Sequence, residues 1–272
     1  MKKAGKALRA LGLIVRHPWL LNHVLDEEMY WKKKVKREFG FSSGLPVIDL
    51  TSLFGDVFSV TVGPLALQDG GSTPADLALL KGLAVKYQVQ RYLEIGTWRG
   101  ESVANVAPVV PECVTLNLPD ETMRARGLPE DYIAAHRHFS KHLPNVTHLQ
   151  ADSTRFDFSS LEQPFGLVFV DGDHHAPVVA SDTANVFRVT DPLKGMIVWH
   201  DYAVNPEKIR WSVLYGILKG CPPMHHHRLF HVANTMCALF LPQSAGPVFS
   251  SFLKPNAPLQ KHFLVTLKVV KN

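Results

Sequence analysis

Short apolar segments that alternate with helix patterns constrain the fold of this chain more than any other feature of its sequence. Five of these segments are predicted to be strands: 91–95, 113–118, 146–150, 167–170 and 196–199. Segments with helical periodicity separate or follow them: 101–107, 131–143, 177–189 and 206–218. Such alternation predicts an α/β fold, in which parallel βαβ units place helices on both faces of one sheet.

Two later apolar segments, 231–241 and 263–270, are also predicted to be strands. No long helix pattern separates them, so we expect an antiparallel pair at the C-terminal edge of a mostly parallel, seven-stranded sheet. A strong helix start lies before the first strand, at Thr73, Pro74 and Asp76. Threonine can cap a helix, proline suits the first helical position, and an acid favours the amide-rich end.

The first 60 residues differ in character, and we predict a helical N-terminal extension over 1–60 and the main domain over 61–272. Apolar residues recur there at helical spacing among basic ones: Leu8, Leu11, Ile14 and Val15. A helix of this kind packs on the main domain, or on a partner subunit in a homo-oligomer. Basic amphipathic helices are also typical of peripheral membrane contact, and this alternative stays open.

Composition and charge exclude several classes of protein. A chain of 272 residues, 46% of them hydrophobic, fits one large domain with extensions. The formal charge of +5 comes largely from basic residues near the N-terminus, so we expect no nucleic-acid partner. Three widely spaced cysteines predict neither a disulfide framework nor a zinc site, and they fit a cytoplasmic protein. The sequence also has no run of about 18 apolar residues, the length that a membrane span requires.

The sequence EIGTWRGES begins at Glu94, within the first strand of the alternating series, and continues through the loop that follows the strand. Gly96 permits a sharp turn, and Gly100 lets backbone amides approach a ligand at a helix start. Trp98 stands where a dinucleotide fingerprint has its middle glycine, so the loop suits a pyrophosphate poorly. We expect instead the carboxylate and ammonium groups of an amino-acid-like ligand, with Glu94 and Ser102 nearby. A plain tight turn is the alternative.

The residues after the next two strands are typical of a nucleoside site. Asn117 lies at the end of the second strand, where nucleoside-binding folds place a ribose-binding acid. Asp152 and Ser153 follow the third strand and offer an acceptor and a hydroxyl to an adenine amino group. Turns and helix caps are the competing explanations for these residues.

The densest polar cluster follows the fourth strand, in the sequence DGDHH that begins at Asp171. A second cluster, His200-Asp201-Tyr202, follows the fifth strand. Asp171 and Asp201 could together hold a hard cation such as Mg²⁺. His174 is a candidate general base, with His200 as the rival base. A hydrogen-bonded structural role is the alternative for either histidine.

With these residues in view, the sequence resembles class I S-adenosylmethionine (SAM)-dependent methyltransferases over residues 70–242. The resemblance is to O-methyltransferases related to catechol O-methyltransferase and to the macrocin O-methyltransferase and cephalosporin hydroxylase families. It depends on the motifs EIGTWRGES, FVDGDHH and KGMIVWHDY, which occur in this order. The resemblance implies a Rossmann-like fold with SAM as the cofactor.

The resemblance also implies roles for individual residues. Those implied to bind SAM are Glu94, Gly96, Gly100, Ser102, Asn117, Asp152, Ser153 and Asp171. In the metal-dependent branch, Asp171 and Asp201 are the carboxylate ligands, whereas Tyr202 replaces an asparagine and is a poor ligand for Mg²⁺. The catalytic base, a lysine in catechol-type enzymes, maps to His174.

We therefore expect SAM-dependent transfer of a methyl group to a hydroxyl of a small molecule or sugar. One alternative is another enzyme on the same scaffold, as the hydroxylase relatives indicate. A second alternative is a noncatalytic, SAM-binding or membrane-associated partner protein in a biosynthetic assembly. The expected location is cytoplasmic, with a membrane-peripheral alternative.

Overall fold

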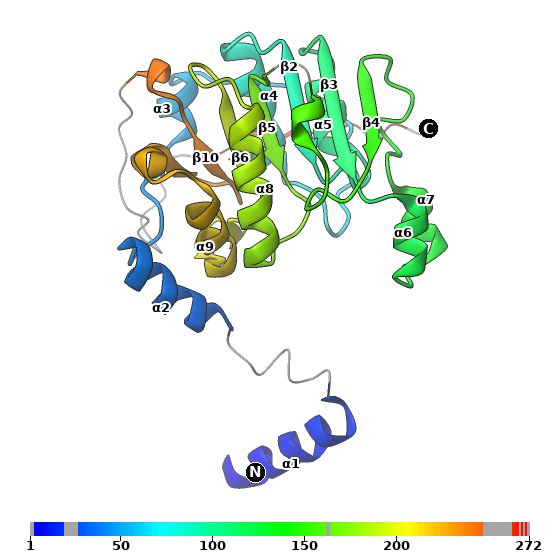
Figure 1. Ribbon diagram of the computed structural model, residues 1–272, viewed down its shortest axis with the longest axis vertical. Coiled ribbons are helices and arrows are strands. Elements are labelled where there is room, and N and C mark those ends of the chain that lie inside the picture. The colour runs from blue at the N-terminus through cyan, green and yellow to red at the C-terminus, as the bar shows by residue number, and fades with distance from the viewer. Residues whose placement is uncertain are drawn as a thin grey trace.

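An eight-stranded sheet with helices on both faces forms the centre of the computed structural model, which describes residues 3–18, 27–161, 164–246, 263–266, 268 and 270 (Figure 1). In order across the sheet, the strands are β1 (Val47–Ile48), β9 (Leu229–Val232), β10 (Ala238–Phe240), β6 (Met196–Trp199), β5 (Leu167–Val170), β2 (Arg91–Ile95), β3 (Glu112–Asn117) and β4 (Val146–Gln150). A separate two-stranded ribbon pairs β7 (Ala203–Asn205) with β8 (Lys208–Ile209).

Most neighbouring strands of the large sheet run parallel. The pairs from β6 through β5, β2 and β3 to β4 are all parallel, as is the pair of β1 and β9. β10 is antiparallel to both of its neighbours, β6 and β9. These pairings confirm the predicted α/β, Rossmann-like fold with its antiparallel strands near the C-terminal edge.

Three details of the predicted sheet are wrong. The sheet has eight strands rather than seven, because β1 joins it from the predicted N-terminal extension. The segment 231–241 is not one strand, because the chain turns at Asn234, where φ is +65°, and returns as β10. This hairpin already supplies the antiparallel pair, and the described residues of 263–270 lie outside any strand.

Helices cover both faces of the sheet (Figure 1). One face carries α8 (Ala176–Val189) and α9 (Trp211–Gly220), and the other carries α3 (Leu50–Phe54), α4 (Pro74–Lys86) and α5 (Glu101–Val106). Further helices are α1 (Lys3–Arg16), α2 (Glu27–Phe39), α6 (Asp120–Ala125) and α7 (Glu130–Ala135). Short 3₁₀ turns are η2 (Phe158–Ser160), η3 (Pro223–Arg228) and η4 (Gln243–Ala245).

Side chains of the central strands alternate between two hydrophobic cores. In β5, Val168 and Val170 belong to the core beneath α8 and α9, whereas Leu167 and Phe169 belong to the core beneath α4 and α5. All four side chains are buried. Burial on both faces explains why β5 is a continuous apolar run in the sequence.

The predicted helix start before β2 is confirmed. Thr73 Oγ1 accepts a hydrogen bond from the Asp76 backbone N–H, and Asp76 Oδ2 accepts one from the Thr73 backbone N–H at 2.7 Å. Pro74 is the first residue of α4. This reciprocal capping box satisfies backbone donors that a helix start otherwise leaves without partners.

The helix predicted over 131–143 is much shorter in the structure. α7 ends at Ala135, and Arg137 has a φ of +63°. The backbone N–H groups of Arg137 and Phe139 donate to the carbonyl oxygens of Trp98 (2.7 Å) and Arg99 (2.9 Å). These bonds replace helical ones, so the segment after α7 supports the glycine-containing loop that follows β2.

Part of the predicted N-terminal extension packs against the main domain. Trp31 and Phe39 of α2 contact the ring of Tyr215 on α9, with ring centroids 4.9 Å and 5.6 Å away. The Tyr215 hydroxyl donates to Glu38 Oε2 at 2.9 Å. The predicted domain boundary at residue 60 stays a prediction.

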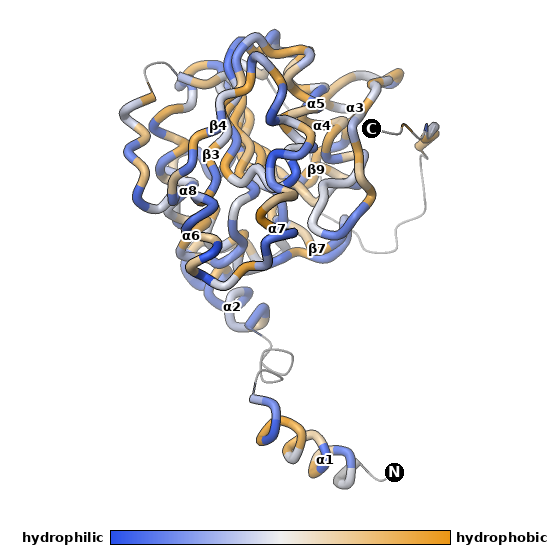
Figure 2. Tube along the Cα trace, turned by 90° about the vertical axis from the view of Figure 1, so that its right-hand side faces the viewer, coloured by the Kyte–Doolittle hydropathy of each residue, from blue (hydrophilic) through white to orange (hydrophobic). Residues whose placement is uncertain are grey.

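α1 differs from α2 because it exposes apolar side chains. Leu8, Leu11 and Val15 are between 59% and 80% exposed, and the helix carries four basic and no acidic residues. Hydrophobic and hydrophilic positions alternate along it (Figure 2). None of the helices in the described part of the chain has the length and hydropathy that crossing a membrane requires.

Candidate active site

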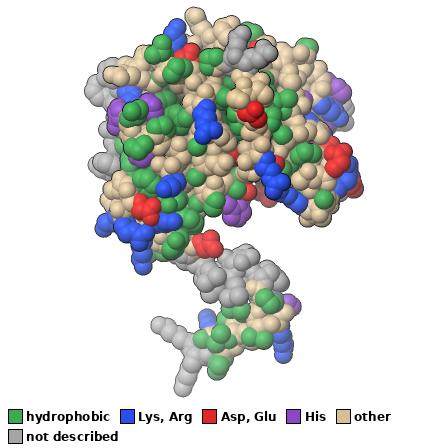
Figure 3. Space-filling view, in the orientation of Figure 1, with side chains coloured by type: hydrophobic (Ala, Val, Ile, Leu, Met, Phe, Trp, Pro, Cys, Tyr) green, Lys and Arg blue, Asp and Glu red, His purple; other side chains and the backbone are tan. Residues whose placement is uncertain are grey.

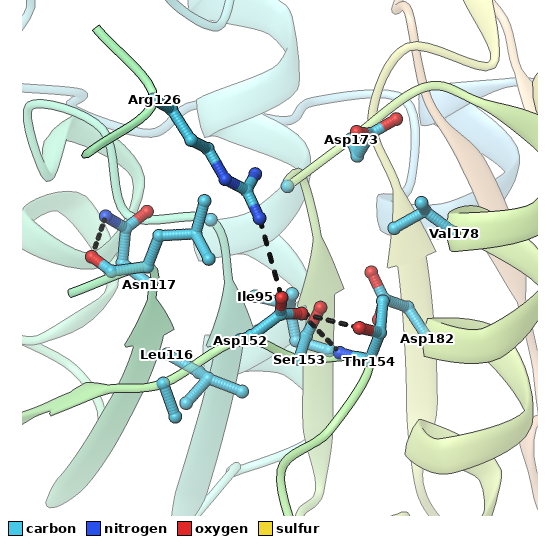
Figure 4. Close-up of a pocket in the computed structure, with 14 residues that line it drawn as sticks. Ile95, Leu116, Asn117, Arg126, Asp152, Ser153, Thr154, Asp173, Val178 and Asp182 are labelled. Atoms are coloured by element: carbon cyan, nitrogen blue, oxygen red, sulfur yellow. Dashed lines mark hydrogen bonds and ion pairs between the residues drawn. The ribbon is translucent and has the colours of Figure 1, made fainter. Parts of the chain in front are cut away.

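A pocket of about 250 Å³ opens at the carboxyl ends of β2, β3 and β4, beside the N-terminal half of α8 (Figure 4). β2 lies between β3 and β5, from which the sheet continues in opposite directions, so strand order reverses here. Open α/β sheets bind their ligands at such a point. Polar residues from several elements line the pocket, among them Asn117, Arg126, Asp152, Ser153 and Asp182.

The structure brings half of the predicted cofactor-binding residues into this pocket. Its lining includes Gly96, Asn117, Asp152 and Ser153. The lining does not include Glu94, Gly100, Ser102 or Asp171. The first three of these are buried near the loop after β2, and Asp171 directly precedes Gly172 and Asp173, which line the pocket.

The backbone around Gly96 is closely packed. Gly96 has a φ of +91°, and a Cβ at this position would collide with the carbonyl group of Asp171. The Gly96 N–H donates to the Leu116 carbonyl at 2.8 Å, and the Asp171 N–H donates to the Ile95 carbonyl at 2.7 Å. Only glycine combines this φ with so close an approach of neighbouring strand ends.

Glu94 is a fully buried carboxyl group in β2. Burial raises its pKa to about 8 against hydrogen bonds from Tyr92 and Ser102, which lower it, and the Asp171 charge adds a further rise. The Tyr92 hydroxyl donates to Glu94 Oε2 at 2.6 Å. With this pKa, most Glu94 side chains are protonated at neutral pH.

Two of the predicted ligand groups are already occupied by the protein itself. Asn117 Oδ1 accepts from the Thr97 N–H at 3.3 Å, and its amide donates to the Leu118 carbonyl at 3.2 Å. Asp152 Oδ1 accepts from the backbone N–H of Thr154 at 3.0 Å and from its hydroxyl at 2.6 Å. Arg126 lies 3.6 Å from the other oxygen of Asp152. Asp152 therefore forms a turn with Thr154, which is the alternative role that the sequence analysis gives for this residue.

Asp182 is a pocket residue that the sequence analysis does not predict. It lies on α8, is fully buried, and lines the pocket. Neither of its carboxylate oxygens has a hydrogen-bond partner among the described residues. The sequence does contain a signal, because Asp182 falls between Val179 and Val186 on the buried stripe of the helix. An acid on such a stripe needs a partner or a ligand.

A second polar cluster lies at the carboxyl ends of β5 and β6. His200 Nδ1 is 3.0 Å from Asp171 Oδ1 and 3.7 Å from Asp201 Oδ2, and its Nε2 is 3.4 Å from Asp76 Oδ2. Arg210 pairs with Asp201 at 3.2 Å. In the sequence Asp76 is recognisable only as a helix-capping residue, since its second role depends on where α4 and β6 meet in space.

The charges in this cluster determine the protonation of His200. Burial lowers the pKa of His200, but the charges and hydrogen bonds of Asp171, Asp201 and Asp76 outweigh burial and raise the pKa well above its usual value. Burial tends to raise the pKa values of Asp76 and Asp201. The interaction with the His200 imidazolium outweighs burial, so the net pKa of each carboxyl is lowered. A protonated imidazole cannot accept a proton, so this geometry does not favour His200 as a general base.

His174 lies on the exposed side of the same cluster. Its ring stacks on that of His175, with centroids 5.2 Å apart, and its charge contributes to the lowered pKa of Asp201. His175 Nδ1 pairs with Asp173 Oδ1 at 2.7 Å. Of the two predicted bases, His174 is therefore the one that a substrate can reach.

The predicted metal site does not suit Mg²⁺ as it is arranged. Ligand atoms of Asp171, His200 and Asp201 all lie within 4.8 Å of one another. However, His200 and Arg210 already neutralise these carboxylates, whereas Mg²⁺ prefers oxygen ligands in octahedral geometry. The Tyr202 hydroxyl is buried and accepts from the Leu45 N–H at 3.0 Å, so it offers no further ligand. We assign no step of the reaction to a metal ion.

A family model described as a methyltransferase domain matches residues 93–202. The match begins in β2 and ends just after β6, so it contains most of the pocket and most of the charged cluster. The chain contains a methyltransferase domain. This match agrees with the predicted resemblance to methyltransferases, and the sheet topology agrees with the predicted Rossmann-like fold.

Solved structures that align with this methyltransferase include two O-methyltransferases. One is TomG from Streptomyces achromogenes, solved with SAM, at 17% identity over 80% of this chain and 91% of that chain, with a TM-score of 0.45. The other is from Bacillus cereus, solved with S-adenosylhomocysteine, at 15% identity over 64% of this chain and 84% of that chain, with a TM-score of 0.44. No curated protein gave a significant match. The family match alone carries the assignment.

Proposed function

We propose that this methyltransferase binds SAM in the pocket at the ends of β2, β3 and β4 and methylates a hydroxyl oxygen of a small molecule or sugar. One observation carries the proposal. The pocket lies where strand order reverses, and through Gly172 and Asp173 it adjoins the cluster that contains His200 and the reachable base, His174. A cofactor site and a proton acceptor are thus next to each other.

The residues of the pocket fit the parts of SAM. Gly96 keeps the loop after β2 tight against the end of β5, which leaves space at the strand ends. Ile95, Leu116 and Val178 give apolar walls, and Asp182 offers an unpaired acceptor. When bound, SAM supplies an electrophilic methyl group on a sulfonium sulfur.

The protein's own residues would orient the acceptor and take its proton. We expect His174 to accept the proton of the acceptor hydroxyl as the oxygen attacks. His200, held as an imidazolium between Asp171 and Asp201, is a positioning residue that fixes the ends of β5 and β6. Its positive charge also compensates these partly buried carboxylates.

Titration calorimetry of the full chain with SAM and S-adenosylhomocysteine tests the proposal. We expect both ligands to bind the wild type, and to bind Val178→Trp at least about tenfold more weakly, because the indole fills the pocket. Val85→Trp is the matched control, since Val85 is a helical valine on the exposed face of α4. It should bind as the wild type does.

Two results would contradict the proposal or restrict it. A well-folded wild type that binds neither ligand leaves another enzyme on the same scaffold as the better hypothesis. Binding without any conversion of SAM to S-adenosylhomocysteine, across a panel of catechols and sugars, supports the noncatalytic partner instead. Methyl transfer to an oxygen of any member of the panel supports the proposal.

We also propose that α1 attaches the protein peripherally to an anionic membrane surface. Its exposed leucines and valine give it an apolar side, and its charge is positive only. Lys and Arg side chains also gather over α2, where Lys32, Lys33, Lys36 and Arg37 are exposed (Figure 3). Such a combination suits the headgroup region of an anionic bilayer. The homo-oligomer and the cytoplasmic location stay predictions.

A further inference from the structure

The strongest unassigned feature of the pocket is the carboxylate of Asp182. The residue is 0% exposed, yet it lines the pocket from α8, next to Val178 and across from Leu116 and Asn117 (Figure 4). Neither oxygen accepts a hydrogen bond from any described residue. A buried carboxylate without donors costs stability, so a purely structural role does not explain it.

Among the described residues, no cation pairs with Asp182. Burial raises its pKa to about 6, and the charges of Asp173 and Asp152 add to this rise. The Ser153 hydroxyl lowers the pKa without reaching hydrogen-bond geometry with either oxygen. Arg126, the cation of the pocket lining, pairs with Asp152 instead. What Asp182 lacks is therefore a hydrogen-bond donor, and a ligand in the pocket can bring one.

The position of Asp182 indicates which donor that is. Asn117 marks the end of β3, where the ribose is expected, whereas Ser153 marks the end of β4, where the adenine is expected. Asp182 and Ser153 line the pocket beside each other, so Asp182 lies on the adenine side (Figure 4). Asp152, the acceptor predicted from the sequence, is already bonded to Thr154 and paired with Arg126.

We propose that Asp182 accepts a hydrogen bond from the exocyclic amino group of the cofactor's adenine and makes the pocket specific for adenine over hypoxanthine. This inference rests on the proposed function, because it takes SAM as the ligand. Hypoxanthine carries a carbonyl oxygen where adenine carries the amino group. That oxygen would face the carboxylate oxygens with no proton between them, and buried sites reject such a mismatch strongly.

The test compares S-adenosylhomocysteine with S-inosylhomocysteine by calorimetry on the full chain. We expect the wild type to bind the adenosyl ligand at least about tenfold more tightly. In Asp182→Asn the side-chain amide can donate to the hypoxanthine oxygen, so the preference should fall to about parity. Asp152→Asn is the matched control: it changes an acid of the same pocket and should keep the wild-type preference.

The outcomes distinguish the role of Asp182 from the binding of SAM by the pocket. An unchanged preference in Asp182→Asn overturns the inference, while binding of S-adenosylhomocysteine by the wild type still supports the proposed function. Loss of the preference in Asp152→Asn, with Asp182→Asn unaffected, would make Asp152 the adenine-reading residue. If Asp182→Asn does not fold, as judged from its melting temperature, Asp182→Ser removes the same acceptor and should lower the preference as well. A wild type that binds neither ligand contradicts the proposed function itself.

Discussion

At the scale of single residues, Glu94 links stability to pH most directly. Its pKa in the folded state is about 8, against an ordinary value of 4.5, because it is buried beside Asp171. The folded state therefore holds the proton more tightly than the unfolded state does. The stabilisation from this group is complete below about pH 4.5 and is lost as the pH rises through about 8.

We expect the neutral variant Glu94→Gln to remove this dependence. Between about pH 5 and pH 9, the unfolding free energy of the wild type should fall relative to that of the variant, by an amount on the order of a few kcal/mol. Denaturant unfolding at several pH values measures the difference. Parallel curves for the two proteins would show that Glu94 does not titrate in this range.

The sequence places residues at the pocket most reliably where a strand end fixes their position. Gly96, Asn117, Asp152 and Ser153 all line the pocket, because each lies at the end of a predicted strand or in the turn after it. Asp182 and Asp76 were not predictable in the same way. Both come from helices, and their partners are defined by packing between elements that lie far apart in the sequence.

At the scale of elements, the strands buried on both faces were predictable, and the shortest ones were not. β2, β4, β5 and β6 coincide with the predicted segments, and in β5 and β6 a run of four apolar residues marks a buried strand. β1 has only two residues and no periodicity, and its assignment depends on its partner β9. α7 is short because backbone bonds to the loop after β2 compete with helical ones.

α1 is the element whose proposed partner can be tested by itself. Vesicles of phosphatidylcholine with phosphatidylglycerol should carry the full chain in a flotation gradient, and pure phosphatidylcholine vesicles should not, since the helix is basic. The double variant Leu8→Gln/Leu11→Gln should reduce flotation at least about fivefold, because it removes apolar contact with the bilayer.

The control for this experiment changes two exposed apolar residues outside α1. Val57→Gln/Leu193→Gln alters side chains that are 94% and 72% exposed and should float as the wild type does. Equal flotation of both double variants would refute the membrane proposal. If the α1 variant instead loses a dimer in sedimentation, and the wild type binds no vesicles, the helix contacts a second subunit.

At the scale of the whole molecule, the predicted extension divides into parts with different roles. α2 packs on α9 through aromatic rings, and β1 completes the sheet, whereas α1 exposes its apolar residues. Removing residues 1–26 should leave the melting temperature nearly unchanged. Removing residues 1–49 should lower it by at least about 5 °C, because α2 and β1 are lost with it. Calorimetric melting of both truncations decides this, and equal melting temperatures would make 1–49 dispensable.

The pairing of Val47 with His231 also has a consequence for synthesis on the ribosome. The N-terminal strand β1 emerges early, but its partner β9 emerges only after most of the sheet has been made. Contacts between such distant parts of a chain form slowly, and an unpaired apolar strand can meet other nascent chains while it waits. The residues around β1 are thus the part of this protein that would benefit most from a chaperone during translation.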